Sequence, residues 1–122
     1  MVQSKILKQN PSVLHLFLNA KESSSDYYLN SLKAAYSCGQ VHQDKIAVID
    51  ERLFYPDCDG LIANRKSVLV IKTADCLPIF LFSGDQKIIV ALHAGWRGLL
   101  SGIISNAFRK MTEFKTDPNG II

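Results

Sequence analysis

The segment KIIVALHAGWRGLLSGII, residues 87–104, changes its hydrophobic period in the middle. The first part is almost continuously apolar and β-branched, which predicts a buried β-strand over residues 87–93. After His93 the apolar residues recur at helical spacing, which predicts a helix over residues 97–114. The apolar positions of this helix are Leu100, Ile103, Ile104, Ala107, Phe108 and Met111. The strand therefore ends in a histidine, two glycines, a tryptophan and an arginine, just before the helix begins.

Two further apolar runs precede this strand. SVLVIK (residues 67–72) and LPIFLF (residues 77–82) each have the length and composition of a strand. The short SGDQ connection between the second run and residues 87–93 predicts an antiparallel hairpin. All three runs are nearly continuous rather than alternating, so we expect a sheet that is covered on both faces.

The chain before these runs carries weaker signals. We predict a strand over residues 12–20, a helix over 24–39, a strand or short hairpin over 40–50, and a loop over 51–67. The loop prediction rests on Pro56 and on the turn signal Asp59-Gly60. At the other end, Asp117-Pro118 ends the last helix, and the final Ile121 and Ile122 resemble the beginning of another strand. We therefore expect residues 1–122 to form a single but incomplete domain.

Composition excludes several classes of protein. The chain has 122 residues, 48% of them hydrophobic and 20% charged, which is ordinary globular usage and argues against disorder. The net charge of +3 is small and scattered, which argues against a nucleic-acid partner. The sequence shows no signal peptide and no apolar run long enough to span a bilayer. We therefore expect a cytoplasmic protein without a membrane partner, whose three cysteines are reduced thiols.

Three residues at predicted strand ends could carry chemistry: His42, Cys76 and His93. Cys76 follows His42 by 34 positions and precedes His93 by 17, which is not the spacing of a zinc finger. It suits an open site assembled from separate strand ends, and two imidazoles with a thiolate leave a fourth zinc position free. Taken singly, Cys76 is better explained as a small buried hydrophobe and His42 as a hydrogen-bonded strand residue. An ionisable His93 at the end of an apolar strand is harder to explain without a partner.

The GWRG turn adds a candidate anion site. Gly95 and Gly98 would let the chain turn sharply into the helix, whose first N–H groups, together with Arg97, could hold phosphate. Alternatively, Arg97 pairs with an acidic neighbour and the adjacent tryptophan only packs. Asp75 could orient a ligand histidine or could cap its turn. We interpret His15, Cys38, Cys58 and the Asp59-Gly60 turn as structural.

The motifs QVH, DGLIAN, TADCLPIFLF and ALHAGWRGLLSGI, in this order, resemble the YfiH-type laccase-domain family over residues 40 to about 114. Members of that family have been called polyphenol oxidases, peptidoglycan-editing factors and purine nucleoside phosphorylases. The resemblance implies an α+β fold in which mixed β-sheets are covered by helices, similar to a group of cysteine hydrolases. It also implies a metal site at His42, Cys76 and His93, with Cys76 and His93 in catalytic roles.

The implied activity is phosphorolysis of adenosine, inosine, guanosine and methylthioadenosine, together with adenosine deamination. Purine nucleosides and phosphate are therefore the expected partners. Zinc is the expected cofactor, and copper is the alternative that the older laccase label suggests. The chain departs from the family at Gln43, where glycine is usual, and in residues 17–25, where a glycine-rich segment is expected. Family members are also much longer, so the resemblance covers only the amino-terminal part of their fold.

Two other interpretations stay open. In the first, the protein is a metal-free hydrolase with Cys76 as nucleophile, His93 as base and the amides of residues 95–98 stabilising an oxyanion. In the second, it is an inactive, truncated relative that pairs an uncovered sheet edge with another chain, as in a homo-oligomer. The sequence also leaves open whether the biological role is nucleoside salvage or peptidoglycan editing.

Overall fold

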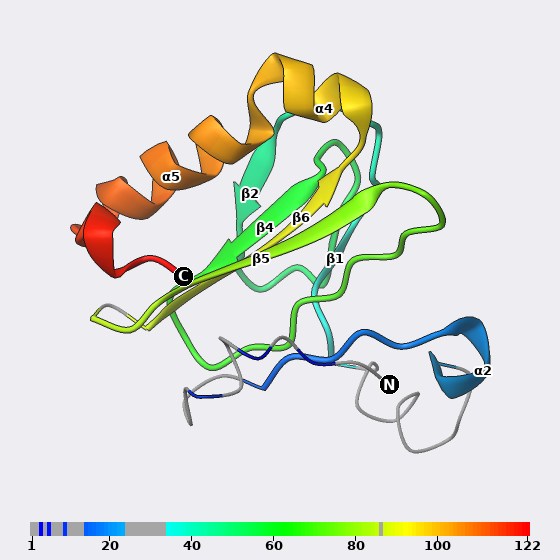
Figure 1. Ribbon diagram of the computed structural model, residues 1–122, viewed down its shortest axis with the longest axis horizontal. Coiled ribbons are helices and arrows are strands. Elements are labelled where there is room, and N and C mark those ends of the chain that lie inside the picture. Colours follow the sequence, from blue (N-terminus) through cyan, green and yellow to red (C-terminus); the bar gives the residue numbers. More distant parts are fainter. Residues whose placement is uncertain (1–2, 4, 6–8, 10–13, 24–33, 86) are drawn as a thin grey trace.

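The fold is α+β, as the sequence predicts, with a mixed sheet and two packed helices. The computed structural model describes residues 3, 5, 9, 14–23, 34–85 and 87–122 (Figure 1). Its elements are α2 (Ala20–Ser23), β1 (Ser37–Cys38), β2 (Ile46–Val48), β3 (Phe54–Tyr55), β4 (Gly60–Ala63), β5 (Leu77–Ser83), β6 (Ile88–Ala94), α4 (Trp96–Ser101), α5 (Ile103–Glu113) and a 3₁₀ turn (Pro118–Gly120). None of the helices in these residues is both long and apolar enough to cross a membrane.

The main sheet has four strands in the order β2-β4-β6-β5. β2 and β4 run parallel, whereas β6 is antiparallel to both β4 and β5. The predicted hairpin is confirmed, with Leu77 opposite Ala94 at one end and Ser83 opposite Ile88 at the other. A separate pair of short parallel strands, β1 and β3, lies beside this sheet.

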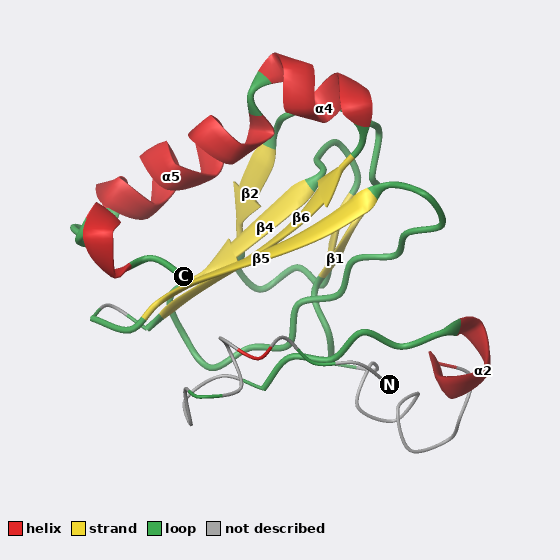
Figure 2. Ribbon diagram, in the orientation of Figure 1, coloured by secondary structure: helices red, strands yellow, loops and turns green. Residues whose placement is uncertain are grey.

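Apolar side chains cover both faces of β4, as the continuous apolar runs led us to expect. On one face, Ile62 packs with Ile103 and Met111 of the helical segment. On the other face, Leu61 packs with Cys38 and other residues around β1 and β3. Figure 2 shows α4 and α5 on one side of the sheet, with the β1 segment on the other. Because successive side chains of a strand point to opposite faces, β4 contributes to both clusters.

β4 itself corrects the prediction of a loop over residues 51–67. The Asp59-Gly60 pair is not a surface turn, because both residues are buried and β4 begins at Gly60. A Cβ at Gly60 would lie 2.7 Å from Leu92 Cδ2 and 2.9 Å from Ile46 Cγ1. Glycine therefore leaves room here for the side chains of the neighbouring strands, and does not serve a turn conformation. β3, at residues 54–55, also falls within the predicted loop.

Two other predictions differ from the structure, one for a helix and one for a strand. The predicted helix over 24–39 is wrong at its described end, because Tyr36 forms a parallel bridge with Leu69 and β1 follows. The remainder of that helix, residues 24–33, lies outside the described residues. Leu69 lies in the run predicted as a strand over 67–72, but this single bridge is its only β-structure. Local apolar periodicity cannot report such long-range backbone pairing.

The predicted strand over 12–20 is also wrong within the described residues 14–19. These contain one bridge residue, Phe17, and α2 begins at Ala20. The Phe17 ring packs on Phe80 of β5 at a centroid distance of 5.2 Å. Phe17 therefore covers β5 by side-chain contact rather than by strand pairing. The prediction for residues 40–50 holds only for β2 at 46–48.

The carboxyl-terminal predictions are confirmed with one modification. The helix predicted over 97–114 is divided at Gly102, whose φ of +91° is left-handed, so α4 ends there and α5 begins. Beyond the 3₁₀ turn, Ile121 bridges Ser83, and Ile122 exchanges two backbone hydrogen bonds with Phe82. The last two residues therefore lie along the outer edge of β5.

Candidate metal centre

His42, Cys76 and His93 come together at one end of the main sheet. One nitrogen of each histidine and the sulfur of Cys76 lie within 4.8 Å of one another. His93 is the second-last residue of β6, whereas Cys76 directly precedes β5. His42 lies in the loop between β1 and β2, with a left-handed φ of 63°. The antiparallel pairing of β5 and β6 brings Cys76 beside the end of β6, because Leu77 lies opposite Ala94.

A buried carboxylate, Asp59, supports the loop that carries His42. Its Oδ1 accepts a hydrogen bond from the His42 amide at 2.8 Å, and its Oδ2 accepts from Gln43 at 2.9 Å and Val41 at 3.2 Å. Backbone bonds hold Asp59 itself: its N–H donates to Lys45 at 2.9 Å, and its carbonyl accepts from the His93 amide at 2.7 Å. The loop conformation around His42 is therefore determined by the carboxylate of a distant residue.

The same carboxylate orients His93. Asp59 Oδ1 lies 2.9 Å from His93 Nδ1, and both side chains are buried. Because the carboxylate only accepts, Nδ1 carries the proton and the Nε2 lone pair of a neutral imidazole is free for a metal or a substrate. The two histidine rings are nearly perpendicular, at 82°, with centroids 4.9 Å apart. The Asp59-Gly60 pair predicted a turn, whereas Asp59 is a buried carboxylate; its position one residue before a buried strand was the available signal.

Gly95 closes one side of the cluster. A Cβ at this position would lie 3.2 Å from Cys76 Sγ and 3.3 Å from His42 Cδ2. Its φ of −73° and ψ of 165° are open to any residue, so the expectation that glycine is needed for a sharp turn is wrong here. What Gly95 provides is space for the sulfur and the imidazole.

The side chain of Gln40 connects the loops of His42 and Cys76. Its Nε2 donates to the Lys72 carbonyl, and its Oε1 accepts from the Lys72 amide at 2.9 Å. We call this two-bond contact the Gln40 clamp. Since Gln40 is two residues from His42 and Lys72 is four from Cys76, the clamp limits the relative movement of the two loops.

The remaining predicted site residues surround the cluster. Arg97 is exposed, and its guanidinium lies 5.1 Å from the centroid of the exposed Trp96 ring. Gly98 is buried against the His42 loop, where a Cβ would lie 2.6 Å from the Gln43 carbonyl oxygen. Asp75 is exposed, and within the described residues the carboxylate bonded to a site histidine is that of Asp59.

The donor set and its spacing fit one zinc ion. Zinc takes imidazole nitrogens at about 2.0 Å and thiolate sulfur at about 2.3 Å, which places tetrahedral ligands roughly 3.3–3.8 Å apart. The donors of His42, Cys76 and His93 lie within 4.8 Å, so small side-chain movements would suffice. Three protein ligands leave the fourth position open, as in catalytic rather than structural sites. The bond between Asp59 and His93 is the outer-shell contact that metal-binding histidines usually have.

Comparison with known proteins identifies the family of the chain. The family model described as multi-copper polyphenol oxidoreductase laccase matches residues 18–122. The chain belongs to this laccase family. Purine nucleoside phosphorylase RC0672 of Rickettsia conorii is 37% identical over 111 residues, a match that covers 89% of this chain and 46% of that protein. The chain thus spans less than half the length of this relative.

Two further relatives widen the comparison. Adenosine deaminase RL5, from an unknown prokaryotic organism, is 32% identical over 83 residues, which cover 59% of this chain and 32% of that protein. The crystal structure of YlmD from Geobacillus stearothermophilus superposes with a TM-score of 0.68 at 27% identity, over 74% of this chain and 38% of that one. The laccase-family fold predicted from the sequence is therefore confirmed.

The name of the laccase family refers to several coppers, but this chain has few histidines. It contains three, and the described residues bring two of them into the one cluster with metal-ligand spacing. A multicopper electron relay needs several such sites, each with several imidazole ligands. The cluster found here therefore suits a single metal ion.

Proposed function

We propose that this chain carries the metal centre of a zinc-dependent purine nucleoside enzyme, which phosphorolyses purine nucleosides and methylthioadenosine and deaminates adenosine. The observation that carries the proposal is the convergence of His42, Cys76 and His93 within 4.8 Å. The names of two relatives, a purine nucleoside phosphorylase and an adenosine deaminase, support the substrate class. The cytoplasm, which keeps a thiolate ligand reduced, is the proposed location.

Zinc is proposed over copper because neither reaction transfers electrons. When bound at an open site, zinc supplies Lewis-acid activation of a water molecule or a substrate oxygen. Two imidazoles and one thiolate are also the protein ligands of blue-copper sites, so the donor set alone is compatible with one copper. The proposed chemistry is what favours the redox-inactive ion.

The residues of the chain have distinct tasks in this proposal. Asp59 keeps the proton of His93 on Nδ1, so that Nε2 retains a lone pair for a metal. Asp59 also holds the His42 loop through three amide hydrogen bonds. Gly95 leaves the space that the Cys76 sulfur occupies. These contacts hold the three donors in place before a substrate arrives, and such preorganisation lowers the cost of binding.

Phosphorolysis also requires an anion site near the sugar. We propose Arg97 and the backbone N–H groups of residues 95–98 for this role, in keeping with the expectation from the sequence. Arg97 is exposed and directly follows the segment that contacts the cluster, which makes it available to a phosphate. Its guanidinium lies beside the Trp96 ring, and a cation–π contact of this kind leaves the N–H groups available as donors to an anion.

A second candidate function is metal-free hydrolysis by Cys76. The bond between Asp59 and His93 favours it, because a nucleophile, a base and an orienting carboxylate are the parts of a catalytic triad. In this alternative His93 Nε2 takes the thiol proton. Such a site needs the thiol to be accessible in the absence of metal, and Cys76 is half-buried.

Elemental analysis of the purified chain tests the two candidates. The zinc proposal predicts about one zinc per chain, lost in Cys76→Ala and in His93→Ala, and protection of Cys76 from alkylation by zinc. Chromatography of adenosine incubated with phosphate should then show adenine or inosine. A folded, zinc-supplied chain that holds no metal, with alkylation of Cys76 unaffected by zinc, would support the hydrolase instead. A chain without any turnover that elutes as an oligomer would support the inactive relative.

A further inference from the structure

Cys38 and Cys58 lie outside the metal centre, in the apolar cluster on one face of β4. Cys38, the last residue of β1, is 7% exposed, and Cys58, two residues before β4, is 1% exposed. Both belong to the apolar cluster that contains Leu61 and Tyr55. Neither contributes to the cluster of His42, Cys76 and His93. The proposed function therefore leaves this pair of thiols without a role.

Backbone hydrogen bonds hold the two cysteines side by side. Cys38 is in parallel register with Tyr55, and the chain turns back over residues 55–58. The two residues that follow Cys38 bond to both ends of this turn: Gly39 donates to the Tyr55 carbonyl at 2.9 Å, and Gln40 donates to the Cys58 carbonyl at 3.0 Å. The Tyr55 carbonyl that accepts from Gly39 also accepts from the Cys58 thiol at 3.6 Å, so the Cys58 sulfur lies beside the residue that follows Cys38. The arrangement is therefore fixed by main-chain contacts rather than by the thiols themselves.

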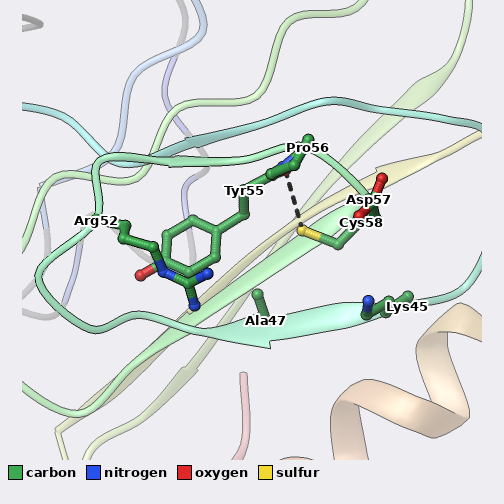
Figure 3. A pocket seen from close by; sticks show the side chains of 7 residues that line it. All are labelled: Lys45, Ala47, Arg52, Tyr55, Pro56, Asp57 and Cys58. Atoms are coloured by element: carbon green, nitrogen blue, oxygen red, sulfur yellow. Dashed lines mark hydrogen bonds between the residues drawn. The ribbon is translucent and has the colours of Figure 1, made fainter.

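A pocket leads to the sulfur of Cys58. It has a volume of about 180 Å³ and is lined by Lys45, Arg52, Asp57 and Cys58, among others. Figure 3 shows the sulfur of Cys58 on the side of the pocket that faces Tyr55 and Ala47, with its hydrogen bond to the Tyr55 carbonyl at 3.6 Å. The volume is several times the roughly 30 Å³ of a water molecule in the liquid, so a small polar oxidant fits. Cys58 lines this pocket, whereas Cys38 is not among its lining residues.

The environments of the two thiols differ. Interaction with Cys38 lowers the pKa of the Cys58 thiol, although burial opposes this effect. Interaction with Cys58, together with burial, raises the pKa of the Cys38 thiol. The thiolate is the reactive form of a cysteine. Its place in the pocket lining and the lowered pKa of its thiol therefore favour Cys58 as the first thiol to react.

We propose that Cys38 and Cys58 form an oxidisable dithiol, which a peroxide converts into an intramolecular disulfide. In the first step the Cys58 thiolate attacks one peroxide oxygen, the O–O bond breaks, and Cys58 sulfenic acid and hydroxide result. In the second step the Cys38 sulfur attacks the Cys58 sulfur, and the hydroxyl leaves with the Cys38 proton as water. Two thiols are oxidised, hydrogen peroxide is reduced to two waters, and a thiol reductant reverses the change.

This disulfide would form directly beside Asp59 and the Gln40 clamp, which support the metal centre. Cys58 precedes Asp59, whose carboxylate holds the His42 loop, and Cys38 precedes the Gln40 clamp by two residues. Oxidation would therefore cross-link the two segments that position His42. The proposal does not depend on the metal or on the nucleoside activity, because both reacting groups lie outside the cluster.

Peptide mapping of the intact wild-type chain tests the proposal. Trypsin places the three cysteines on separate peptides, residues 34–45, 53–65 and 73–87. The folded chain is treated with hydrogen peroxide at neutral pH, quenched with catalase, alkylated in denaturant and digested. We expect peptides 34–45 and 53–65 to be joined with the loss of two hydrogens, peptide 73–87 to remain separate, and dithiothreitol to restore both thiols. Chain oxidised in urea is the control, in which all three pairings should appear.

Dimedone, which traps sulfenic acids, tests the order of the steps. In Cys38→Ser, Cys58 should be trapped by dimedone, whereas in Cys58→Ser the labelling of Cys38 should be about tenfold lower or absent. Three outcomes would overturn the proposal: a folded chain with no link between 34–45 and 53–65, the same mixture of pairings in folded and unfolded chain, or links only between molecules. A mixture of ¹⁵N-labelled and unlabelled chain identifies the last outcome. The wild-type experiment is decisive even if a serine variant fails to fold.

Discussion

Replacement of Asp59 by asparagine is the most direct test of how the metal centre is built. The side chain keeps its shape but exchanges one acceptor oxygen for an NH₂ group. If Oδ1 stays an oxygen, the new NH₂ faces the amides of Val41 and Gln43. If the amide flips, the NH₂ faces the His42 amide and Nδ1 of His93. In either orientation, the new NH₂ group therefore faces N–H groups that need an acceptor.

The magnitude follows from these contacts. Asp59 is fully buried, but the bonds that it accepts from Val41 and Gln43 are only partly buried, so water replaces part of the lost acceptor. A fully buried donor left without a partner costs about 1–3 kcal/mol, so the loss of two bonds here should lower the free energy of unfolding by at most about 2–6 kcal/mol. In the flipped orientation Nδ1 must accept, and the proton moves to Nε2, where a metal would bind. Loss of such an outer-shell partner lowers metal affinity by about 10–100-fold, which is about 1.4–2.7 kcal/mol.

The assay separates stability from metal binding. Urea denaturation of the metal-free chain measures the first quantity, and competition with a chromogenic zinc chelator measures the second. Asp75→Asn is the matched control: the same change next to Cys76, at an exposed carboxylate. It should alter stability by no more than about 0.5 kcal/mol and leave zinc affinity unchanged. If Asp75→Asn weakens zinc binding while Asp59→Asn does not, the assignment of Asp59 as the supporting carboxylate is wrong.

Three other substitutions test the packing around the site and the core. Gly95→Ala places a methyl group 3.2 Å from the cluster sulfur, so zinc affinity in the chelator assay should fall, whereas Gly120→Ala, with open space at its Cβ, should change nothing. Gln40→Ala removes both bonds of the Gln40 clamp, which should cost about 1–3 kcal/mol in urea denaturation and speed alkylation of the cluster thiol. Equal alkylation rates would refute the clamp. Met111→Ala opens a cavity in the core at a cost of about 2–5 kcal/mol, whereas Leu100→Ala, at an 81% exposed position, should be nearly neutral in the same assay.

The elements that the sequence predicts correctly are those whose secondary structure is set by their local hydrophobic pattern. The hairpin of β5 and β6 is predicted because two apolar runs are joined by a short polar turn, and its register follows from that turn. The helical segment after His93 is predicted by its period, although the break at Gly102 is not. β4 was missed because GLIA is short and follows a turn-like Asp-Gly pair. Its strand structure comes from β2 and β6 on either side, which a local pattern cannot report.

The sequence by itself determined the types of donor at the site, because only histidine and cysteine side chains bring imidazole and thiolate ligands to a strand end. It also determined the apolar runs from which the sheet is built. The tertiary structure decided the rest: that Asp59 holds His42 and His93 together, that Gly95 provides space rather than a turn, and that Cys38 lies beside Cys58. These relations join residues that are far apart in the chain. Their energies come from burial and hydrogen bonds that exist only once the strands have paired.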